Sequence, residues 1–237
     1  MIIANNVSKQ FGKLQALQNV SVTCNKGECI ALIGPNGSGK TTLIKSILGM
    51  VVPDSGFITF NGNNILHHWQ YRSEIGYMPQ IGRYPDNMRI VDVLNMMKDI
   101  RQHKGAIDEE LIAAFGLEEL KQKRMRTLSG GTRQKVSACL AFLFDPQVLI
   151  LDEPTAGLDP VSSEILKEKI IREKQKGKLV LVTSHVLSEL DDLVTQVIYM
   201  QDGELRFHKT IEALREDTGQ EKLSKAIAHV MLNASTL

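Results

Sequence analysis

This sequence of 237 residues has few cysteines, few aromatic residues and almost no net charge. Its 28 Lys and Arg residues nearly balance 27 Asp and Glu residues, so the formal net charge is only +1. This balance excludes the strongly basic field that draws proteins to nucleic acid or to acidic lipid. The three cysteines, Cys24, Cys29 and Cys139, lack the spacing of a metal site. We therefore expect buried, reduced thiols, as is usual in the cytosol.

Long apolar runs are absent as well. The longest, such as VLIL and LVLV, have the length of a strand, whereas a membrane-spanning helix needs roughly 20 apolar residues. The first residues, MIIANNVSKQFG, lack the basic and apolar regions of a signal peptide. We therefore expect a cytosolic chain that forms one domain over residues 1–237, with 43% hydrophobic residues to supply its core.

The order of the sequence patterns predicts an α/β fold. Alternation and turns over residues 1–30 and 55–62 predict antiparallel strands. Helical spacing predicts an α-helical insert at about 83–145. Two short apolar runs, VLIL and LVLV, flank a helical stretch, the pattern of parallel strands joined by a helix. In that helix Ile165, Lys169 and Arg172 are spaced to mix apolar and charged faces.

The end of the chain, about 212–237, has a helical pattern with one apolar stripe. The stripe consists of Leu223, Ile227, Val230 and Met231. We interpret it as a surface that packs on the chain's own domain, and contact with a partner is the alternative.

A glycine-rich loop, GPNGSGKTT, follows the apolar strand CIALIG and precedes the helical stretch LIKSILGM. It has the form G-x-x-x-x-G-K-[ST] in the strand–loop–helix context that binds nucleotide phosphates. Its glycines let backbone N–H groups turn toward phosphate oxygens, and the helix N-terminus attracts the same anion. Lys40 is expected to neutralise the β- and γ-phosphates, and the Thr41 hydroxyl to bind Mg²⁺. The predicted ATP-binding residues here are Gly34, Pro35, Asn36, Gly37, Ser38, Gly39, Lys40, Thr41 and Thr42.

Two acidic residues, Asp152 and Glu153, stand at the end of the apolar run VLIL. In parallel sheets ligands bind at the carboxyl ends of the strands. Asp152 is therefore predicted to bind Mg²⁺, and Glu153 to act as the catalytic base that activates a water for attack on the γ-phosphate. His185 ends the next apolar run, VLVTSH, and is predicted to donate a hydrogen bond to the γ-phosphate.

A second pair of glycines, Gly130 and Gly131, follows Ser129 in the stretch LSGGTRQ and opens a predicted helix. This is again the composition of a phosphate-binding loop. It has no phosphate-binding lysine of its own, so on its own it would be an incomplete site.

Together and in this order, the motifs resemble those of the ATP-binding subunit of an ABC transporter, over nearly the whole chain. In that resemblance GPNGSGKTT is the Walker A motif, VLILD is Walker B, and LSGGTRQ is the family signature, with Thr132 where many members have glutamine. Gln80 in GYMPQIG resembles the Q-loop glutamine, Asp159 in AGLD lies in the D-loop, and His185 is the switch histidine. Phe11 falls where the family places an aromatic residue under adenine; the alternative is an ordinary core residue at a strand end.

The resemblance implies a P-loop NTPase core with a mostly parallel sheet, an antiparallel β subdomain and an α-helical insert. It also implies two subunits, here a homodimer, that enclose two ATP molecules with Mg²⁺ head to tail. Ser129, Gly130, Gly131 and Asp159 would then act on the ATP held by the other subunit. Gln80 would bind Mg²⁺ and link the site to a separate transmembrane permease, which places the chain at the cytoplasmic face of a membrane.

Other branches of the superfamily fit less well, because the chain has neither a long coiled coil nor a second ATPase domain. An ATP-dependent regulatory or binding module without transport is the remaining alternative. Some stretches resemble subunits associated with nitrous oxide reductase maturation, which are linked to copper or sulfur-species transport. His67, His68, Met96 and Met97 are interpreted as loop histidines and helix-core methionines rather than as metal ligands.

Overall fold

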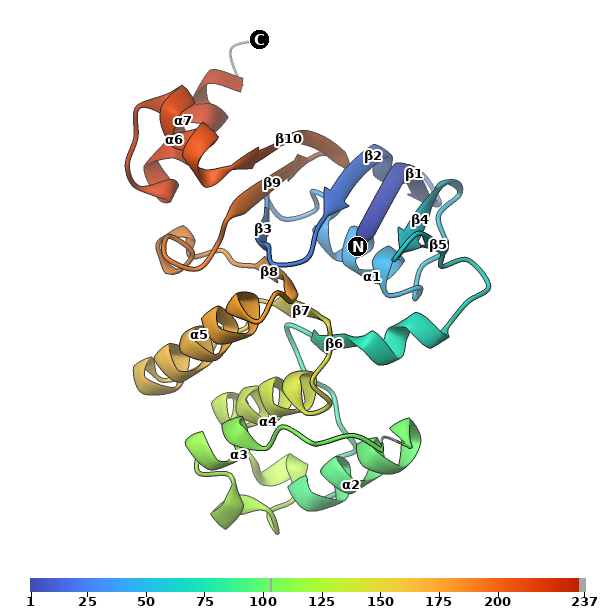
Figure 1. Ribbon diagram of the computed structural model, residues 1–237, viewed down its shortest axis with the longest axis vertical. Helices are drawn as coiled ribbons and strands as arrows, with labels where there is room; N and C mark the ends of the chain where they lie inside the picture. The colour runs from blue at the N-terminus through green and yellow to red at the C-terminus, as the bar shows by residue number, and fades with distance from the viewer. Residues whose placement is uncertain (103, 235–237) are drawn as a thin grey trace. The chain divides into compact units, whose positions relative to one another are not determined.

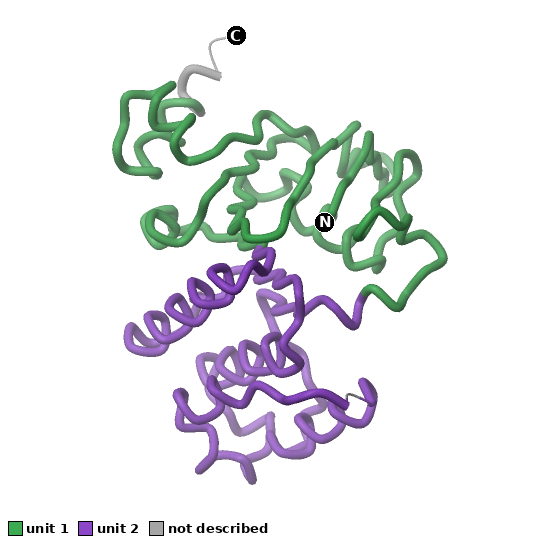
Figure 2. Tube along the Cα trace, in the orientation of Figure 1, with its two compact units in different colours: residues 1–71, 181–237 green, residues 72–180 purple. Residues whose placement is uncertain are grey.

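The computed structural model describes residues 1–102 and 104–234 of the chain (Figure 1). These residues form two compact units, shown in Figure 2. The first combines residues 1–71 with the chain from 181 onward, and the second comprises residues 72–180.

An antiparallel sheet opens the first unit, as the sequence predicts. Its strands lie in the order β2-β1-β4-β5. On β1, Ile2 and Ala4 are buried while Ile3 and Asn5 are exposed, so one face of the sheet supplies core. The four strands are β1 (Ile2–Phe11), β2 (Leu14–Cys24), β4 (Ser55–Phe60) and β5 (Asn63–Asn64).

A second group of strands in the first unit carries the glycine-rich loop. β3 (Cys29–Ile33) is buried at every position and pairs in parallel with β9 (Gln196–Gln201). β9 pairs in turn with β10 (Glu204–Thr210), which is antiparallel to it. Helix α1 (Lys40–Ile47) follows β3 through the loop, and β8 (Leu179–Thr183) spans the boundary between the units. A fully apolar strand followed by glycines and a helix is therefore the local framework of the predicted phosphate site.

The end of the chain packs on its own unit. Helix α6 (Ile211–Thr218) stops at Gly219, whose φ of 64° is the left-handed conformation that ends helices. Helix α7 (Leu223–Ala234) buries Leu223 and Ile227, and the Leu223 N–H donates to Asp191 Oδ1 at 2.7 Å. The within-chain interpretation of the apolar stripe is thus the one that the structure favours; the side chain of Met231 lies outside the described residues.

The second unit contains two parallel strands and most of the helices. β6 (Ile75–Met78) pairs in parallel with β7 (Val148–Asp152). Within the predicted α-helical insert, the helix after Asp108 is short, because Gly116 adopts a φ of 65° and ends it after little more than one turn. The helices are α2 (Ile90–Arg101), α3 (Glu110–Ala114), α4 (Gly130–Phe142) and α5 (Pro160–Gln175), with 3₁₀ turns η1 (Gln70–Glu74, entering from the first unit), η2 (Glu118–Leu120) and η3 (Met125–Thr127).

A buried ionic network fixes α5 in the second unit. Lys169 is only 1% exposed, although its helical position suggested a mixed, partly charged face. Its Nζ contacts Asp108, Glu110 (2.7 Å) and Glu173 (3.2 Å). Burial alone would lower the pKa of Lys169, but the hydrogen bonds that its ammonium group donates to Asp108 and Glu110 outweigh this effect and raise the pKa. Glu173, which is also buried, is paired with Lys176 and Lys178 as well.

Replacing Lys169 by methionine is expected to lower the free energy of unfolding by up to about 3 kcal/mol, because it removes the buried cation that Asp108, Glu110 and Glu173 share. The measurement is guanidinium chloride unfolding of the variant and the wild type. Lys167→Met is the matched control: it removes a lysine on the same helix whose partner, Glu164, is 68% exposed, so it should cost less than about 1 kcal/mol. Equal effects of the two substitutions would contradict the importance of the buried network.

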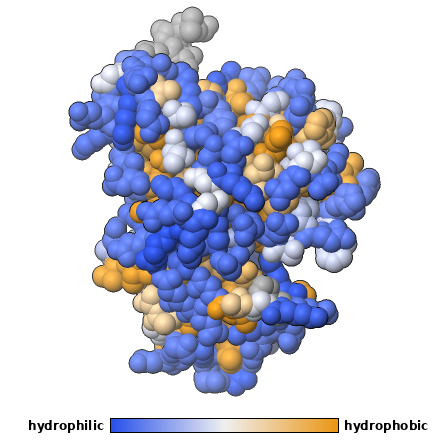
Figure 3. Space-filling view, viewed as in Figure 1, coloured by the Kyte–Doolittle hydropathy of each residue, from blue (hydrophilic) through white to orange (hydrophobic). Residues whose placement is uncertain are grey.

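The face in Figure 3 is largely hydrophilic, and hydrophobic residues appear on it in small separate groups. Among the described residues, no helix combines the length and the apolar content that crossing a membrane requires. All three cysteines are buried thiols, as predicted, and burial raises the pKa of Cys24 to about 12, so its thiol stays protonated near neutral pH.

Candidate nucleotide-binding site

The loop between β3 and α1 has a backbone that glycine alone accommodates. Gly34, Gly37 and Gly39 have φ values of 149°, 81° and 99°. A Cβ at Gly34 would lie 2.0 Å from the Met200 carbonyl oxygen, and a Cβ at Gly39 would lie 2.5 Å from the Ala16 carbonyl oxygen. Side chains are thus excluded at both positions, and the loop backbone can approach a phosphate closely.

Residues far along the chain support this loop. The Gly203 N–H donates to the Ser38 carbonyl oxygen at 3.2 Å, and the Gln18 N–H donates to the Gly203 carbonyl oxygen at 2.8 Å. Gly203 itself has a φ of 79° and approaches the Ala16 backbone closely. The β9–β10 turn and β2 therefore hold the loop in shape. This role of Gly203 is not predicted by the sequence, in which the turn dipeptide Asp202-Gly203 is the only local signal.

Lys40 folds back over the loop. Its Nζ donates to the carbonyl oxygens of Gly34 (2.7 Å) and Pro35 (2.9 Å). The ammonium group is thus positioned beside the backbone that precedes α1, while the first N–H groups of α1 have no partners within the helix. A cation and a helix N-terminus at the same loop form an anion-binding site.

Asp152 and Glu153 end strand β7 in the second unit. Asp152 is 8% exposed, and after burial it is the second cause of the raised pKa of Tyr77 on the neighbouring strand β6. Glu153 has a φ of 51°, a left-handed conformation that costs a non-glycine residue about 1–3 kcal/mol. Such backbone strain commonly marks functional sites, where the surrounding structure holds a side chain in a required direction.

The signature stretch opens helix α4. Ser129 is its N-cap, and Ser129 Oγ accepts a hydrogen bond from the Thr132 N–H. A Cβ at Gly130 would meet nothing within 4 Å, whereas one at Gly131 would lie 2.7 Å from the Gly157 carbonyl oxygen. Gly130 thus leaves space open in front of the helix N-terminus, and Gly131 permits close contact with the AGLD segment.

Two further residues connect these motifs within the second unit. Gln134, which is buried, donates from Nε2 to the Glu153 carbonyl oxygen at 3.4 Å. Lys135 pairs with Asp159 at 2.9 Å, and Asp159 also caps α5. The hydrogen bond with Lys135 and those with Ser162 hold the pKa of Asp159 well below its usual value. Asp159 is thus engaged within its own chain, and its predicted contact with a partner's ATP stays a prediction.

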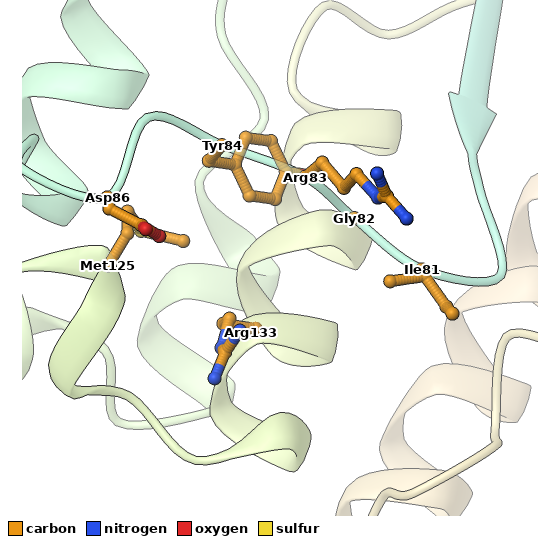
Figure 4. A pocket seen from close by; sticks show the side chains of 7 residues that line it. All are labelled: Ile81, Gly82, Arg83, Tyr84, Asp86, Met125 and Arg133. Carbon is orange, nitrogen blue, oxygen red and sulfur yellow. The ribbon is translucent and has the colours of Figure 1, made fainter.

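Gln80 is exposed and follows β6. The residues after it line a pocket of about 400 Å³ (Figure 4). The loop from Ile81 to Asp86 forms one side, and Met125 and Arg133 come from the segments leading into and along α4. Ile81 is 70% exposed. The pocket joins the Q-loop to the start of the signature helix.

Phe11 and His185 are both exposed residues of the first unit. Phe11, at the end of β1, is 48% exposed, which argues against the alternative of an ordinary core residue. The Lys9 ammonium lies 5.4 Å from its ring centroid. His185 follows β8, and the next turn is held by a hydrogen bond of 3.0 Å from the Val186 N–H to Ser184 Oγ. Among the described residues no group of three or more His, Cys, Asp or Glu side chains is arranged to hold a metal ion.

The model of the family described as ABC transporter matches residues 17–156. This chain belongs to the ABC transporter family. It is 32% identical to the ABC transporter ATP-binding protein NatA of Bacillus subtilis, over 94% of this chain and 95% of NatA. It is 30% identical to the lantibiotic transport ATP-binding protein SrtF of Streptococcus pyogenes, over 98% of both chains. Against the human phospholipid-transporting ATPase ABCA3 the identity is 34%, but the chain spans only 12% of that protein's length.

Solved ABC structures share this architecture. The structure of an ATP-binding subunit of an ABC transporter superposes with a TM-score of 0.90 at 26% identity, covering 98% of this chain and 99% of the other. A dimeric ATP-binding cassette, MJ0796, bound to ADP and Pi, has the same fold at a TM-score of 0.79 and 24% identity, covering 89% of this chain and 99% of its own. The predicted ABC ATPase fold is thereby confirmed. The chain is an ATP-binding and ATP-hydrolysing subunit of an ABC transporter.

Proposed function

We propose that two copies of this chain enclose two ATP molecules head to tail, and that each ATP binds the Walker A loop of one copy and the signature stretch of the other. The observation that carries this proposal is the N-terminus of α4. Ser129 and Gly130 are exposed there and open to an anion, yet the nearby cation Lys135 is paired with Asp159. A helix N-terminus whose own lysine is engaged by a carboxylate suits a phosphate whose lysine comes from another molecule.

The donor set in the chain is suited to Mg²⁺. We propose that the Thr41 hydroxyl, the Gln80 amide oxygen and the Asp152 carboxylate contribute to its coordination, because Mg²⁺ prefers oxygen ligands. Bound Mg²⁺ would neutralise part of the charge on the β- and γ-phosphates. Thr41 and Gln80 are exposed and thus accessible to a nucleotide, while Asp152 ends a buried strand that fixes its backbone.

Two side chains are proposed to act on the reacting groups. Glu153 accepts a proton from the attacking water or orients it, and His185 donates a hydrogen bond to the γ-phosphate. The strained backbone of Glu153 and the exposure of His185 support these roles. Both side chains are borne on segments that directly follow a buried strand, β7 and β8 respectively.

Phe11→Ala is expected to weaken ATP binding about threefold to tenfold without abolishing it, because stacking of a base on an aromatic ring contributes roughly 1 kcal/mol. Titration calorimetry with ATP measures this effect. Phe57→Ala, which removes another exposed aromatic ring of the same sheet, is the control and should leave the affinity unchanged. Binding of the Phe11 variant at wild-type affinity would show that the adenine lies elsewhere.

We propose further that the pocket beside Gln80 receives a cytoplasmic segment of a separate transmembrane permease, so that the chain works at the cytoplasmic face of a membrane. Ile81 offers an exposed apolar contact, and Arg83 and Arg133 favour an acidic residue in that segment. The experiment is co-purification of the tagged chain from native membranes, followed by identification of the recovered membrane protein.

Arg83→Glu is expected to reduce the recovery of the permease several-fold, because it reverses the charge at the pocket. Arg215→Glu makes the same charge change at an exposed position on α6 and should not affect recovery. Recovery of a membrane protein with both variants alike would contradict the docking surface. Recovery of no membrane protein even with the wild-type chain would favour a regulatory module without transport.

A further inference from the structure

The signature stretch differs from many family members by having Thr132, and this residue makes two contacts with Ser129. Thr132 donates its backbone N–H to Ser129 Oγ at 3.2 Å. Its hydroxyl, Oγ1, lies 2.9 Å from the same oxygen. Ser129 is the N-cap of α4, and Thr132 is the third residue of that helix. Both contacts of the Ser129 hydroxyl therefore come from one residue.

The position of Thr132 explains why its side chain reaches Ser129. Glutamine or glutamate at the third helical position commonly extends back to the backbone N–H of the N-cap residue. The threonine side chain is shorter, and its hydroxyl bonds instead to the side chain of the N-cap residue. Because threonine is branched at Cβ, its rotation about χ1 is restricted, which keeps the hydroxyl at this place.

The contacts with Thr132 limit what the Ser129 hydroxyl can still bind. The hydroxyl has one proton to donate and two lone pairs that accept. When Thr132 donates both its N–H and its O–H to Ser129 Oγ, the two lone pairs are filled and only the Ser129 proton remains. That proton is directed away from Thr132, where Ser129 is exposed and Gly130 leaves open space. A hydroxyl in this state donates to an anion and has no lone pair left for water.

We propose that Thr132 is a positioning residue for ATP-dependent dimerisation: its amide and hydroxyl together orient the Ser129 proton toward the γ-phosphate of ATP bound to a second copy. Either oxygen can be the donor in the Ser129–Thr132 contact, and an approaching phosphate selects the arrangement in which Thr132 donates. This inference rests on the proposed function of Ser129 and assigns a role to a residue outside the phosphate contacts proposed above.

Thr132→Val tests the inference, because valine keeps the branched shape and the backbone N–H but removes the hydroxyl. In a Glu153→Gln background, which slows hydrolysis, the dissociation constant of the Mg-ATP dimer is expected to rise about twofold to tenfold, the effect of one hydrogen bond. Thr132→Ser is expected to recover dimerisation to near the wild-type value, since it restores the hydroxyl. Analytical ultracentrifugation at a series of protein concentrations measures these constants.

Two controls separate positioning from a merely structural role. Thr127→Val removes a nearby hydroxyl that bonds to the Arg124 carbonyl oxygen instead, and it should leave the dimer constant unchanged. In a Ser129→Ala background the Thr132→Val effect should vanish, because the hydroxyl that it orients is gone. The inference is overturned if Thr132→Val dimerises like the wild type, or if its effect persists without the Ser129 hydroxyl. If Ser129→Ala itself leaves dimerisation unchanged, the proposed role of Ser129 fails instead.

Discussion

Glu153→Gln is expected to lower the rate of ATP hydrolysis at least about 100-fold, the scale of a lost general base, and to leave ATP bound. The amide keeps nearly the shape of the carboxylate but cannot take a proton from water. Because hydrolysis is what removes the γ-phosphate, the variant should accumulate as a dimer with two ATP molecules enclosed. Phosphate release measures the first effect, and size-exclusion chromatography with Mg-ATP measures the second.

The backbone at Glu153 makes this test specific. Its left-handed φ of 51° and the hydrogen bond from Gln134 to its carbonyl oxygen do not depend on the carboxylate, so glutamine should adopt the same conformation. Glu164→Gln is the matched control, because Glu164 is an exposed residue of α5 that pairs with Lys167. It should hydrolyse ATP like the wild type. A Glu153→Gln protein that stays monomeric with ATP bound would argue against the enclosed dimer.

Lys40→Ala is expected to weaken ATP binding about 10- to 100-fold, because hydrogen bonds to charged groups are worth about 1.5–3 kcal/mol. In the protein described here the Lys40 ammonium lies over the loop carbonyl groups of Gly34 and Pro35. Its loss removes the cation but leaves the glycine backbone and the helix N-terminus, so some affinity should remain. Titration calorimetry with ATP is the measurement.

The control for Lys40 is Lys45→Ala. Lys45 is exposed on the same helix, in its last turn, and has no role in the proposed site. Its replacement should change ATP affinity by less than twofold, roughly the size of a surface charge effect. If Lys40→Ala bound ATP as tightly as the wild type, the assignment of this loop to the phosphates would be wrong.

The sequence predicted the features that depend on local order along the chain. The Walker A loop was predictable because a buried strand, glycines, a lysine and a helix follow one another within a few residues. The antiparallel start, α2 and the helix α5 likewise follow from alternation or helical spacing. The conformation of the loop was harder to foresee, since it depends on Met200, Ala16 and Gly203, which approach from distant segments.

Features that depend on packing were predicted less well. Lys169 was expected on a mixed face of its helix, yet the structure buries it among carboxylates of α3 and α5. The contact between Gly131 and Gly157 and the bond between Thr132 and Ser129 have no signature in a linear pattern. The sequence shows which residues lie three positions apart on a helix. Whether the hydroxyl groups of such a pair bond to each other depends on the side-chain conformations.

The transported substrate does not follow from the ATP-binding motifs. Relatives at about 30% identity bear names that refer to lantibiotic transport, Nod factor export and phospholipid transport. The residues proposed to bind ATP interact with its phosphates and its adenine. These groups are the same whatever substrate is transported, so the residues do not identify the substrate. Co-purification identifies the permease. The identity of the permease therefore tests the resemblance to subunits associated with nitrous oxide reductase maturation.

A mixing experiment tests most directly the central claim that each ATP site is built from two copies of the chain. Lys40→Ala disables the site that uses its own Walker A loop, and Ser129→Arg disables the site that its signature stretch completes in the partner. Each variant alone should be nearly inactive even with excess Mg-ATP, because Lys40 also stabilises the charge on the reacting phosphate and Ser129→Arg blocks the signature contact with it. In a mixed dimer one site carries both defects and the other is intact, so the mixture should regain hydrolysis. A mixture as inactive as the separate variants would contradict the account.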